Sequence, residues 1–301
     1  MTRSTVDRRI FIVGAPRSGT TLLQSLLAAH SEVTSFTESH FFRTHYSNIP
    51  VVALPILSGD PRPRVFEFLA ENGETPPPAA QWFSERNRWT LRIRAFLPFQ
   101  TIPVARRLIR VLDELALRRG VENWVEKTPW HLRAIPLLEK ASPGERPYFL
   151  HVIRNGMEVV ASLHRASRKW QRSYDLEACV ARWNADLGRS LERTGSPNDR
   201  FVAYEELTSH PEATVKEILA GLGLAWEPAI LKNYAGVSES VITAGEDWKA
   251  GVGRRIRPSA TSDELLTPQQ RQWVVERLNH RLYDRVLESC GRRSHAAAGA
   301  G

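Results

Sequence analysis

The stretch that most constrains the fold of this chain is Gly14-Ala15-Pro16-Arg17-Ser18-Gly19-Thr20-Thr21. An apolar run leads into it over 10–13, and leucines at helical spacing follow it over 22–27. A strand, a glycine-containing turn and a helix in this order form a phosphate-binding loop, because the first amide groups of a helix have no partners inside it. We therefore predict that this loop binds an anion.

The loop departs from the nucleoside triphosphatase pattern at one position. The spacing of Gly14 and Gly19 fits G-x-x-x-x-G-K-[ST], but Thr20 stands where the lysine would be. The positive charge of the loop comes from Arg17 instead. This substitution argues against ATP or GTP hydrolysis.

A second arginine marks the other half of the predicted site. The strongest buried strand, expected over 148–153, ends in Arg154 rather than in the aspartate that would hold magnesium. An arginine binds anions, and Ser162 follows near the start of the next helix. These residues predict a ligand with two separate anionic groups and no metal, with Arg17 at one group and Arg154 at the other.

Composition places the chain among globular proteins. Of its 301 residues, 42% are hydrophobic and 25% are charged. The net charge of +8 fits an anionic ligand, although the preference for arginine over lysine can also reflect genomic base composition. Cys179 and Cys290 form neither a metal-ligand spacing nor a disulfide framework. With no secretory leader and no apolar run long enough to span a membrane, we expect a cytoplasmic protein.

Strands and helices alternate along most of the chain, which predicts an α/β fold with a central parallel sheet flanked by helices. Strands are expected at 9–13, 32–36, 123–126, 148–153 and 200–203. Helices are expected at 20–29, 65–71, 103–119, up to 140, 157–164, 176–193, 211–222 and 268–280. We predict one domain over 1–290, with a helical insertion at 43–120 that covers the site, and a disordered tail at 291–301.

Two of these segments carry a family resemblance. Pro16-Arg17-Ser18-Gly19-Thr20-Thr21, together with Val152-Ile153-Arg154-Asn155-Gly156 and Ser162, resembles the two nucleotide signatures of sulfotransferases that use 3′-phosphoadenosine 5′-phosphosulfate (PAPS). The resemblance implies a P-loop-like three-layer sandwich. It also implies that the first loop binds the 5′-phosphosulfate and that Arg154 and Ser162 bind the 3′-phosphate. Gly156 stands where the family more often has proline.

The resemblance extends to a catalytic base. Thr37-Glu38-Ser39-His40-Phe41-Phe42 is similar to a stretch of the heparan sulfotransferases, which use the matching glutamate. We therefore predict Glu38 as the general base, with His40 as the alternative. Glu38 can also cap a helix or pair with an arginine, and His40 can be a packed neighbour.

Charge on the bridging oxygen needs a cation, for which Arg17 is the first candidate and Lys127 the second. Glu126-Lys127-Thr128-Pro129 is similar to a weaker family motif, and the tyrosine-sulfating members have a comparable Lys-x-Pro stretch. The alternative is a surface lysine paired with Glu126. His131, nearby, fits either a substrate contact or a solvent-facing position.

The remaining nucleotide contacts are implied by the resemblance alone. Tyr204 resembles the family tyrosine near adenine, although it can also be a packing residue. Arg254 and Arg255 lie in a stretch, 248–255, that resembles the segment closing over the 3′-phosphate.

These features predict a PAPS-dependent sulfotransferase that acts on a hydroxyl or amine and releases adenosine 3′,5′-bisphosphate. The apolar and aromatic content of 43–120 favours a small-molecule or lipidic acceptor. The arginine series at 86–94 is interpreted as a solvated helix face, so no nucleic acid partner is expected. A P-loop small-molecule kinase and a non-catalytic nucleotide binder are the alternatives.

Overall fold

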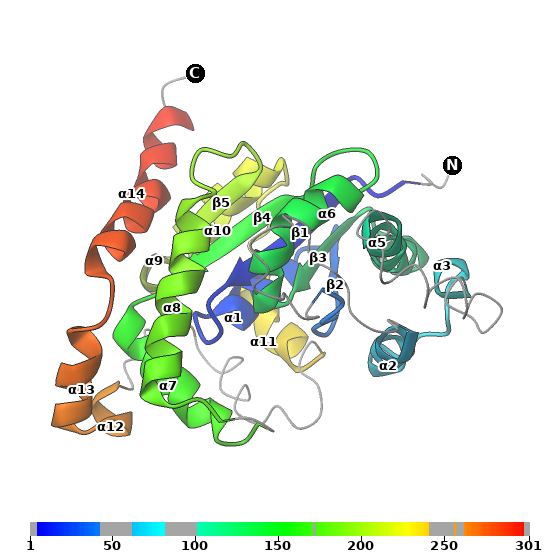
Figure 1. Cartoon of the computed structure of the whole chain (residues 1–301). Coiled ribbons are helices and arrows are strands. Elements are labelled where there is room, and N and C mark those ends of the chain that lie inside the picture. The colour runs from blue at the N-terminus through cyan, green and yellow to red at the C-terminus, as the bar shows by residue number, and fades with distance from the viewer. Residues whose placement is uncertain are drawn as a thin grey trace.

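Five parallel strands form the central sheet, in the order β2-β3-β1-β4-β5 (Figure 1). The computed structural model describes residues 5–42, 62–81, 101–170, 173–240, 256 and 262–297. The strands are β1 (Arg8–Gly14), β2 (Val33–Ser35), β3 (Asn123–Lys127), β4 (Tyr148–Ile153) and β5 (Asp199–Ala203). Helices flank this sheet, so the predicted α/β architecture is confirmed.

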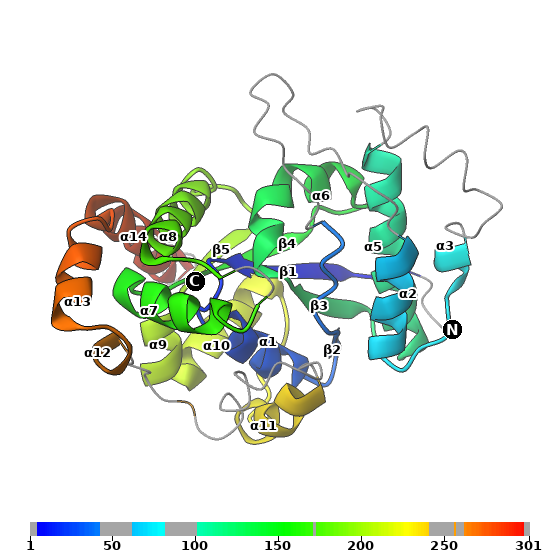
Figure 2. The same ribbon diagram turned by 60° about the horizontal axis from the view of Figure 1, so that its bottom comes forward.

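The helices follow the strands in regular alternation. They are α1 (Thr20–Ala28), α2 (Arg62–Glu71), α3 (Pro78–Gln81), α5 (Thr101–Arg118), η3 (Pro129–Ala134, a 3-10 helix), α6 (Ile135–Ala141), α7 (Gly156–Ser167), α8 (Leu176–Leu191), α9 (Tyr204–Ser209), α10 (Pro211–Leu222), α11 (Ile230–Ser240), α12 (Ser262–Leu265), α13 (Pro268–Val275) and α14 (His280–Ala297). The helices α12, α13 and α14 lie on the α7–α8 side of the molecule, away from α2 and α5 (Figure 2).

Successive side chains of β1 point to opposite faces of the sheet, so they contribute to two separate apolar clusters. Ile10 and Ile12 pack with residues of α1, α10 and α11. Phe11 and Val13 face the opposite way and pack with residues of α5 and α6. The sheet is therefore the middle of three layers.

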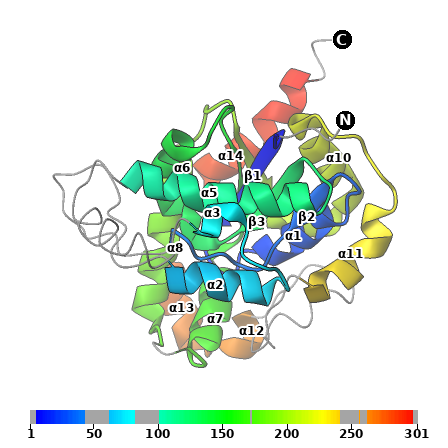
Figure 3. The same cartoon turned by 90° about the vertical axis from the view of Figure 1, so that its right-hand side faces the viewer.

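The helix α5 belongs to one of these layers and connects β2 to β3. Its apolar side is buried in the same cluster as Phe11 and Trp124. Asp113 of α5 accepts hydrogen bonds from both Arg9 Nε and Arg9 Nη2 at 2.9 Å, and from Trp124 Nε1 at 2.9 Å. The helix α5 therefore covers one face of the sheet, and the helical insertion predicted over 43–120 as a cover for the site stays a prediction. Figure 3 shows α2 and α3 beside α5; the ranges 43–61 and 82–100, including the arginine series, lie outside the described residues.

One prediction near the C-terminus needs correction. The helix expected over 268–280 ends at Val275, and a further helix begins at His280. That helix continues to Ala297, and 298–301 lie outside the described residues. The disordered tail predicted over 291–301 stays a prediction.

Candidate active site

The residues predicted for the site follow the carboxyl ends of all five strands. The loop at 14–19 follows β1, Glu38 follows β2, Lys127 ends β3, Arg154 follows β4 and Tyr204 follows β5. Because the strands are parallel, these ends share one edge of the sheet, which is where ligands bind in open α/β folds.

The loop after β1 has the backbone that an anion site needs. Arg17 and Gly19 both have a positive φ, of 74° and 95°, and Gly19 is the N-cap of α1. Glycine has no capping oxygen, so the first amide groups of α1 are left to solvent or an anion. A Cβ atom at residue 19 would lie 2.2 Å from Cδ2 of Tyr204, so this position accepts only glycine without a shift of that ring. The side chains of Ser18, Thr20 and Thr21 are buried, and Pro16 is half-buried.

The structure joins the two predicted anion-binding segments directly. Arg17 Nε donates a hydrogen bond to Ser162 Oγ at 3.1 Å, and Arg154 Nη1 donates to the Arg17 carbonyl at 3.0 Å. The Arg154 guanidinium lies 4.3 Å from the centroid of the Tyr204 ring. Two arginines, a hydroxyl and an aromatic face therefore meet at the loop.

Tyr204 is buried at the start of α9. Burial raises the pKa of its hydroxyl, and the positive charge of Arg154 opposes this shift without cancelling it. The phenol stays protonated at neutral pH, and its ring packs against the loop at Gly19.

Close packing explains the glycine at position 156. A Cβ atom there would lie 2.8 Å from Leu278 Cδ2 and 2.9 Å from Trp183 Cζ2. The Trp183 indole N–H donates to the Arg154 carbonyl at 3.2 Å. Asn155 caps α7 by accepting from the Met157 amide at 2.9 Å. Gly156 thus lets the indole reach the backbone that carries Arg154.

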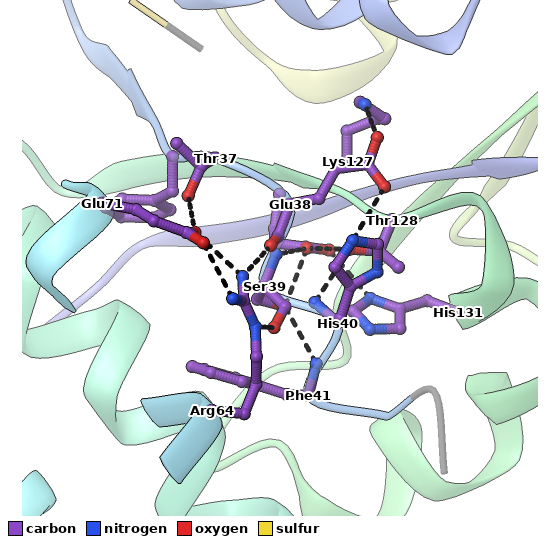
Figure 4. A network of polar contacts seen from close by, with 12 residues as sticks. Thr37, Glu38, Ser39, His40, Phe41, Arg64, Glu71, Lys127, Thr128 and His131 are labelled. Atoms are coloured by element: carbon purple, nitrogen blue, oxygen red, sulfur yellow. Dashed lines mark hydrogen bonds and ion pairs between the residues drawn. The ribbon is translucent and has the colours of Figure 1, made fainter. Parts of the chain in front are cut away.

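The predicted base is held by the predicted lysine (Figure 4). Lys127 Nζ donates to Glu38 Oε1, and His40 Nε2 lies 3.5 Å from Glu38 Oε2. The lysine side chain is 1% exposed, that of Glu38 is 15% exposed and that of His40 is 29% exposed. The alternative of a surface lysine paired with Glu126 is therefore wrong. Among its described contacts, Glu38 pairs with this lysine, and both Glu38 and His40 retain access to solvent.

Sequence reasoning missed the role of Glu126, which is completely buried. Its Oε1 accepts from the Ser39 amide at 3.0 Å, from Ser39 Oγ at 2.8 Å and from Thr128 Oγ1 at 2.6 Å. Its Oε2 lies 2.8 Å from His131 Nδ1. His131 is also fully buried, so a solvent-facing position for it is wrong. A charged residue in a buried strand, followed five positions later by histidine, was the available signal.

Contacts with His131, Thr128 and Ser39 keep Glu126 ionised. Burial alone would raise the pKa of this carboxyl group, but the interaction with His131 and the hydrogen bonds from Thr128 and Ser39 outweigh burial and lower it. The Glu126 carboxylate is therefore a fixed negative charge that is hydrogen bonded to the segment that carries Glu38.

Arg64 of α2 contacts the same segment from the other side (Figure 4). Its Nη2 donates to the Glu38 carbonyl at 2.6 Å, and its Nε donates to the Ser39 carbonyl at 2.8 Å. Its two terminal nitrogens each lie 2.9 Å from a carboxylate oxygen of Glu71. The helix α2 is thereby tied to the main chain on both sides of Ser39.

Comparison with known proteins gives this geometry a family. The sequence pattern described as the sulfotransferase family matches residues 9–228, which include the loop, Glu38, Lys127, Arg154 and Tyr204. The chain belongs to the sulfotransferase family.

Several curated relatives of this chain are named as protein-tyrosine sulfotransferases. Protein-tyrosine sulfotransferase A of Caenorhabditis elegans is 26% identical over 231 residues, covering 74% of this chain and 51% of its own length. Protein-tyrosine sulfotransferase 2 of Gallus gallus is 27% identical over 254 residues, covering 79% and 58%. The chain thus spans between half and three fifths of the length of these two relatives.

Solved structures show the same fold at low identity. The sulfotransferase domain of the Synechococcus olefin synthase aligns with a TM-score of 0.54 and 18% identity, covering 92% of this chain and 96% of that domain. The mouse sulfotransferase SULT7A1, crystallised with PAP, aligns with a TM-score of 0.50 and 14% identity, covering 99% of this chain and 90% of that one.

Three further expectations concern the phosphate-closing arginines, metal binding and membrane-spanning helices. Arg254 and Arg255 lie outside the described residues. Within the described ranges, no group of three or more His, Cys, Asp or Glu side chains is placed to hold a metal ion. Among the helices described, none has the length and hydropathy needed to cross a bilayer.

Proposed function

We propose that this sulfotransferase moves the sulfuryl group of PAPS to a hydroxyl or amine of an acceptor, with Glu38 as the general base. The observation that carries the proposal is the Glu38 carboxylate, held by Lys127 and flanked by His40 at the carboxyl edge of the sheet. A base must reach the acceptor from a fixed position, and this arrangement supplies one.

The residues around the loop fit the donor nucleotide. Arg17 and the loop 16–21 would hold the 5′-phosphosulfate at the N-terminus of α1. Arg154 and Ser162 would hold the 3′-phosphate, with Tyr204 near adenine; Arg254 and Arg255 stay candidates for the same phosphate. The crystallisation of a mouse relative with PAP supports this assignment. When bound, the donor supplies the sulfuryl group and a phosphate leaving group.

In an in-line transfer, each of these side chains would have its own role. The S–O bond to the 5′-phosphate breaks, a bond from sulfur to the acceptor atom forms, and the acceptor proton passes to Glu38. Arg17, and Lys127 after it, would offset negative charge on the bridging oxygen. His40, beside the second carboxylate oxygen of Glu38, would orient the base.

Two acceptor classes follow from different observations. The apolar content of 43–120 favours a small or lipidic molecule. The names of the curated relatives favour a tyrosine side chain of a protein. An acceptor screen with both classes is therefore part of the test.

The test measures sulfuryl transfer from labelled PAPS with wild-type protein and Glu38→Gln. We expect the variant to lose roughly 10²- to 10⁴-fold in kcat, the usual contribution of a general base, and to bind adenosine 3′,5′-bisphosphate as wild type does. Glu139→Gln is the matched control, because Glu139 is a partly exposed carboxylate of α6 that pairs with Arg193. Unchanged turnover in Glu38→Gln would remove Glu38 as the base. Thermal stabilisation by ATP with magnesium, but not by the bisphosphate, would overturn the donor assignment.

A further inference from the structure

The segment 38–42, here called the Glu38 strap, crosses the end of β3. Four consecutive main-chain N–H groups of the strap are hydrogen bonded. They run from Ser39 to Glu126 Oε1 at 3.0 Å, from His40 to Thr128 Oγ1 at 3.3 Å, from Phe41 to Ser39 Oγ at 3.4 Å, and from Phe42 to His131 Nε2 at 3.4 Å.

All of these bonds lead to one carboxylate. Glu126 accepts the bond from the Ser39 amide directly. The side chains that accept the other three bonds are themselves hydrogen bonded to Glu126; they are Ser39, Thr128 and His131. Because His131 Nε2 accepts from Phe42, its proton is on Nδ1, which donates to Glu126 Oε2. The strap is thus bound to Glu126 directly or through a single intervening side chain.

The strap has a conformation that needs such an anchor. His40 has a φ of 52°, in the left-handed region that side-chain-bearing residues rarely adopt. Such residues persist where the surrounding structure over-determines them. Glu126 and Lys127 are neighbours on β3 and point to opposite faces. One holds the main chain of the strap and the other meets the Glu38 carboxylate, so the end of β3 contacts the strap on both sides.

We propose that Glu126 is a positioning residue for the base, and that its carboxylate sets the place of Glu38 through the strap. This proposal rests on the proposed role of Glu38. Both oxygens of Glu126 accept hydrogen bonds, whereas a glutamine has one accepting oxygen and one donating NH₂ group. Glu126→Gln therefore keeps the size of the side chain and breaks at least one link to the strap.

The first experiment is a double-variant cycle on kcat. In wild-type background we expect Glu126→Gln to lower kcat roughly 10- to 100-fold, the scale of a small displacement of a reacting group. In Glu38→Gln background we expect no further loss, because the base that Glu126 positions is already absent. A general structural defect would give the same loss in both backgrounds, and that result would overturn the proposal.

Asp199→Asn is the matched control, because Asp199 is a second fully buried carboxylate among the described residues that pairs with a fully buried histidine, His151. We expect it to lower stability and to leave kcat of the folded protein unchanged. If Asp199→Asn lowered kcat as much as Glu126→Gln, the loss would not be specific to the strap and the proposal would fail.

A second experiment does not depend on activity. Amide hydrogen exchange of the strap should be faster in Glu126→Gln than in wild type, while exchange of β1 and α1 stays the same. If Glu126→Gln does not fold, Thr128→Val removes one link and should raise exchange at His40. Unchanged strap exchange in the folded variant would overturn the proposal. A wild-type protein without sulfuryl transfer would overturn the proposed function, and the exchange result would still decide whether Glu126 anchors the strap.

Discussion

Two buried carboxylate–histidine pairs on one face of the sheet have similar geometry and different surroundings. Glu126 and His131 lie 2.8 Å apart, as do Asp199 and His151, and all four side chains have no exposed surface. The first pair is at the carboxyl end of β3. The second spans β4 and β5, where Asp199 is the first residue of its strand.

The partners of each pair show what it does. Asp199 accepts from Arg193 at 2.8 and 3.0 Å, and His151 Nδ1 lies 3.1 Å from Ser190 Oγ of α8. This pair joins α8 to two strands. Glu126 instead binds the Glu38 strap. The same chemical pair therefore fastens a helix in one place and the segment with the proposed base in the other.

Together with Ser190, which contacts His151, the second pair has the three residue types of a hydrolase triad. Here Ser190 is 1% exposed, and His151 and Asp199 are completely buried. A nucleophile needs access to its substrate, so this arrangement is structural.

The largest effect that separates the two pairs is expected from Asp199→Asn. The substitution removes the buried carboxylate from its ion pair with the partly exposed Arg193 and from its contact with the buried His151, and breaking a buried pair costs about 3 kcal/mol. We expect the free energy of unfolding, measured by urea denaturation, to fall by about that much. Turnover per folded molecule should stay at the wild-type value; a parallel loss of kcat would break the distinction between the pairs.

The next largest effect is expected from Arg154→Ala, which leaves both carboxylate–histidine pairs in place. Arg154 bonds the Arg17 carbonyl and lies over Tyr204, so its loss should weaken the nucleotide side of the site. We expect affinity for adenosine 3′,5′-bisphosphate, measured by calorimetry, to fall roughly 10- to 100-fold, the value of a hydrogen bond to a charged group. Exchange of the strap amides should not change. Undiminished affinity would contradict the assignment of Arg154.

The smallest effect concerns pH and tests the Asp199–His151 pair alone. Burial lowers the pKa of His151, although the hydrogen bond to Asp199 opposes the shift. The unfolded chain binds a proton at this residue below about pH 6.5, and the folded chain binds it only at a lower pH. Stability should therefore fall as the pH drops below about 6.5, by at most about 1.4 kcal/mol per pH unit from this group.

Asp199 adds to the fall at lower pH. Burial raises the pKa of its carboxyl group, but the contacts with His151 and Arg193 outweigh burial and lower it. Denaturation curves of wild type and His151→Gln between pH 7.5 and 5.5 isolate the histidine contribution. An equally steep fall in both proteins would show that His151 is not its source.

The sequence was enough to predict each strand of the described residues to within one residue, most clearly for β1 and β4, which are mainly apolar runs. It also led to the loop, Arg154, Glu38 and Lys127, because local motifs mark strand ends. It did not reveal the strap anchor. Glu126 and Ser39 are 87 positions apart, and only the pairing of β2 with β3 brings them together. The same holds for Arg64, whose contacts with the strap depend on the packing of α2.

The close approach of Gly19 to Tyr204 has a consequence for how this enzyme can vary. Any side chain at position 19 must displace a ring on which the Arg154 guanidinium rests. A substitution there must also adopt the φ of 95°, so a smaller residue at position 204 removes the clash but not the backbone strain, and the two positions are not free to change independently. The order of mutations, as much as their identity, limits the routes by which the proposed nucleotide site of this chain can be redesigned.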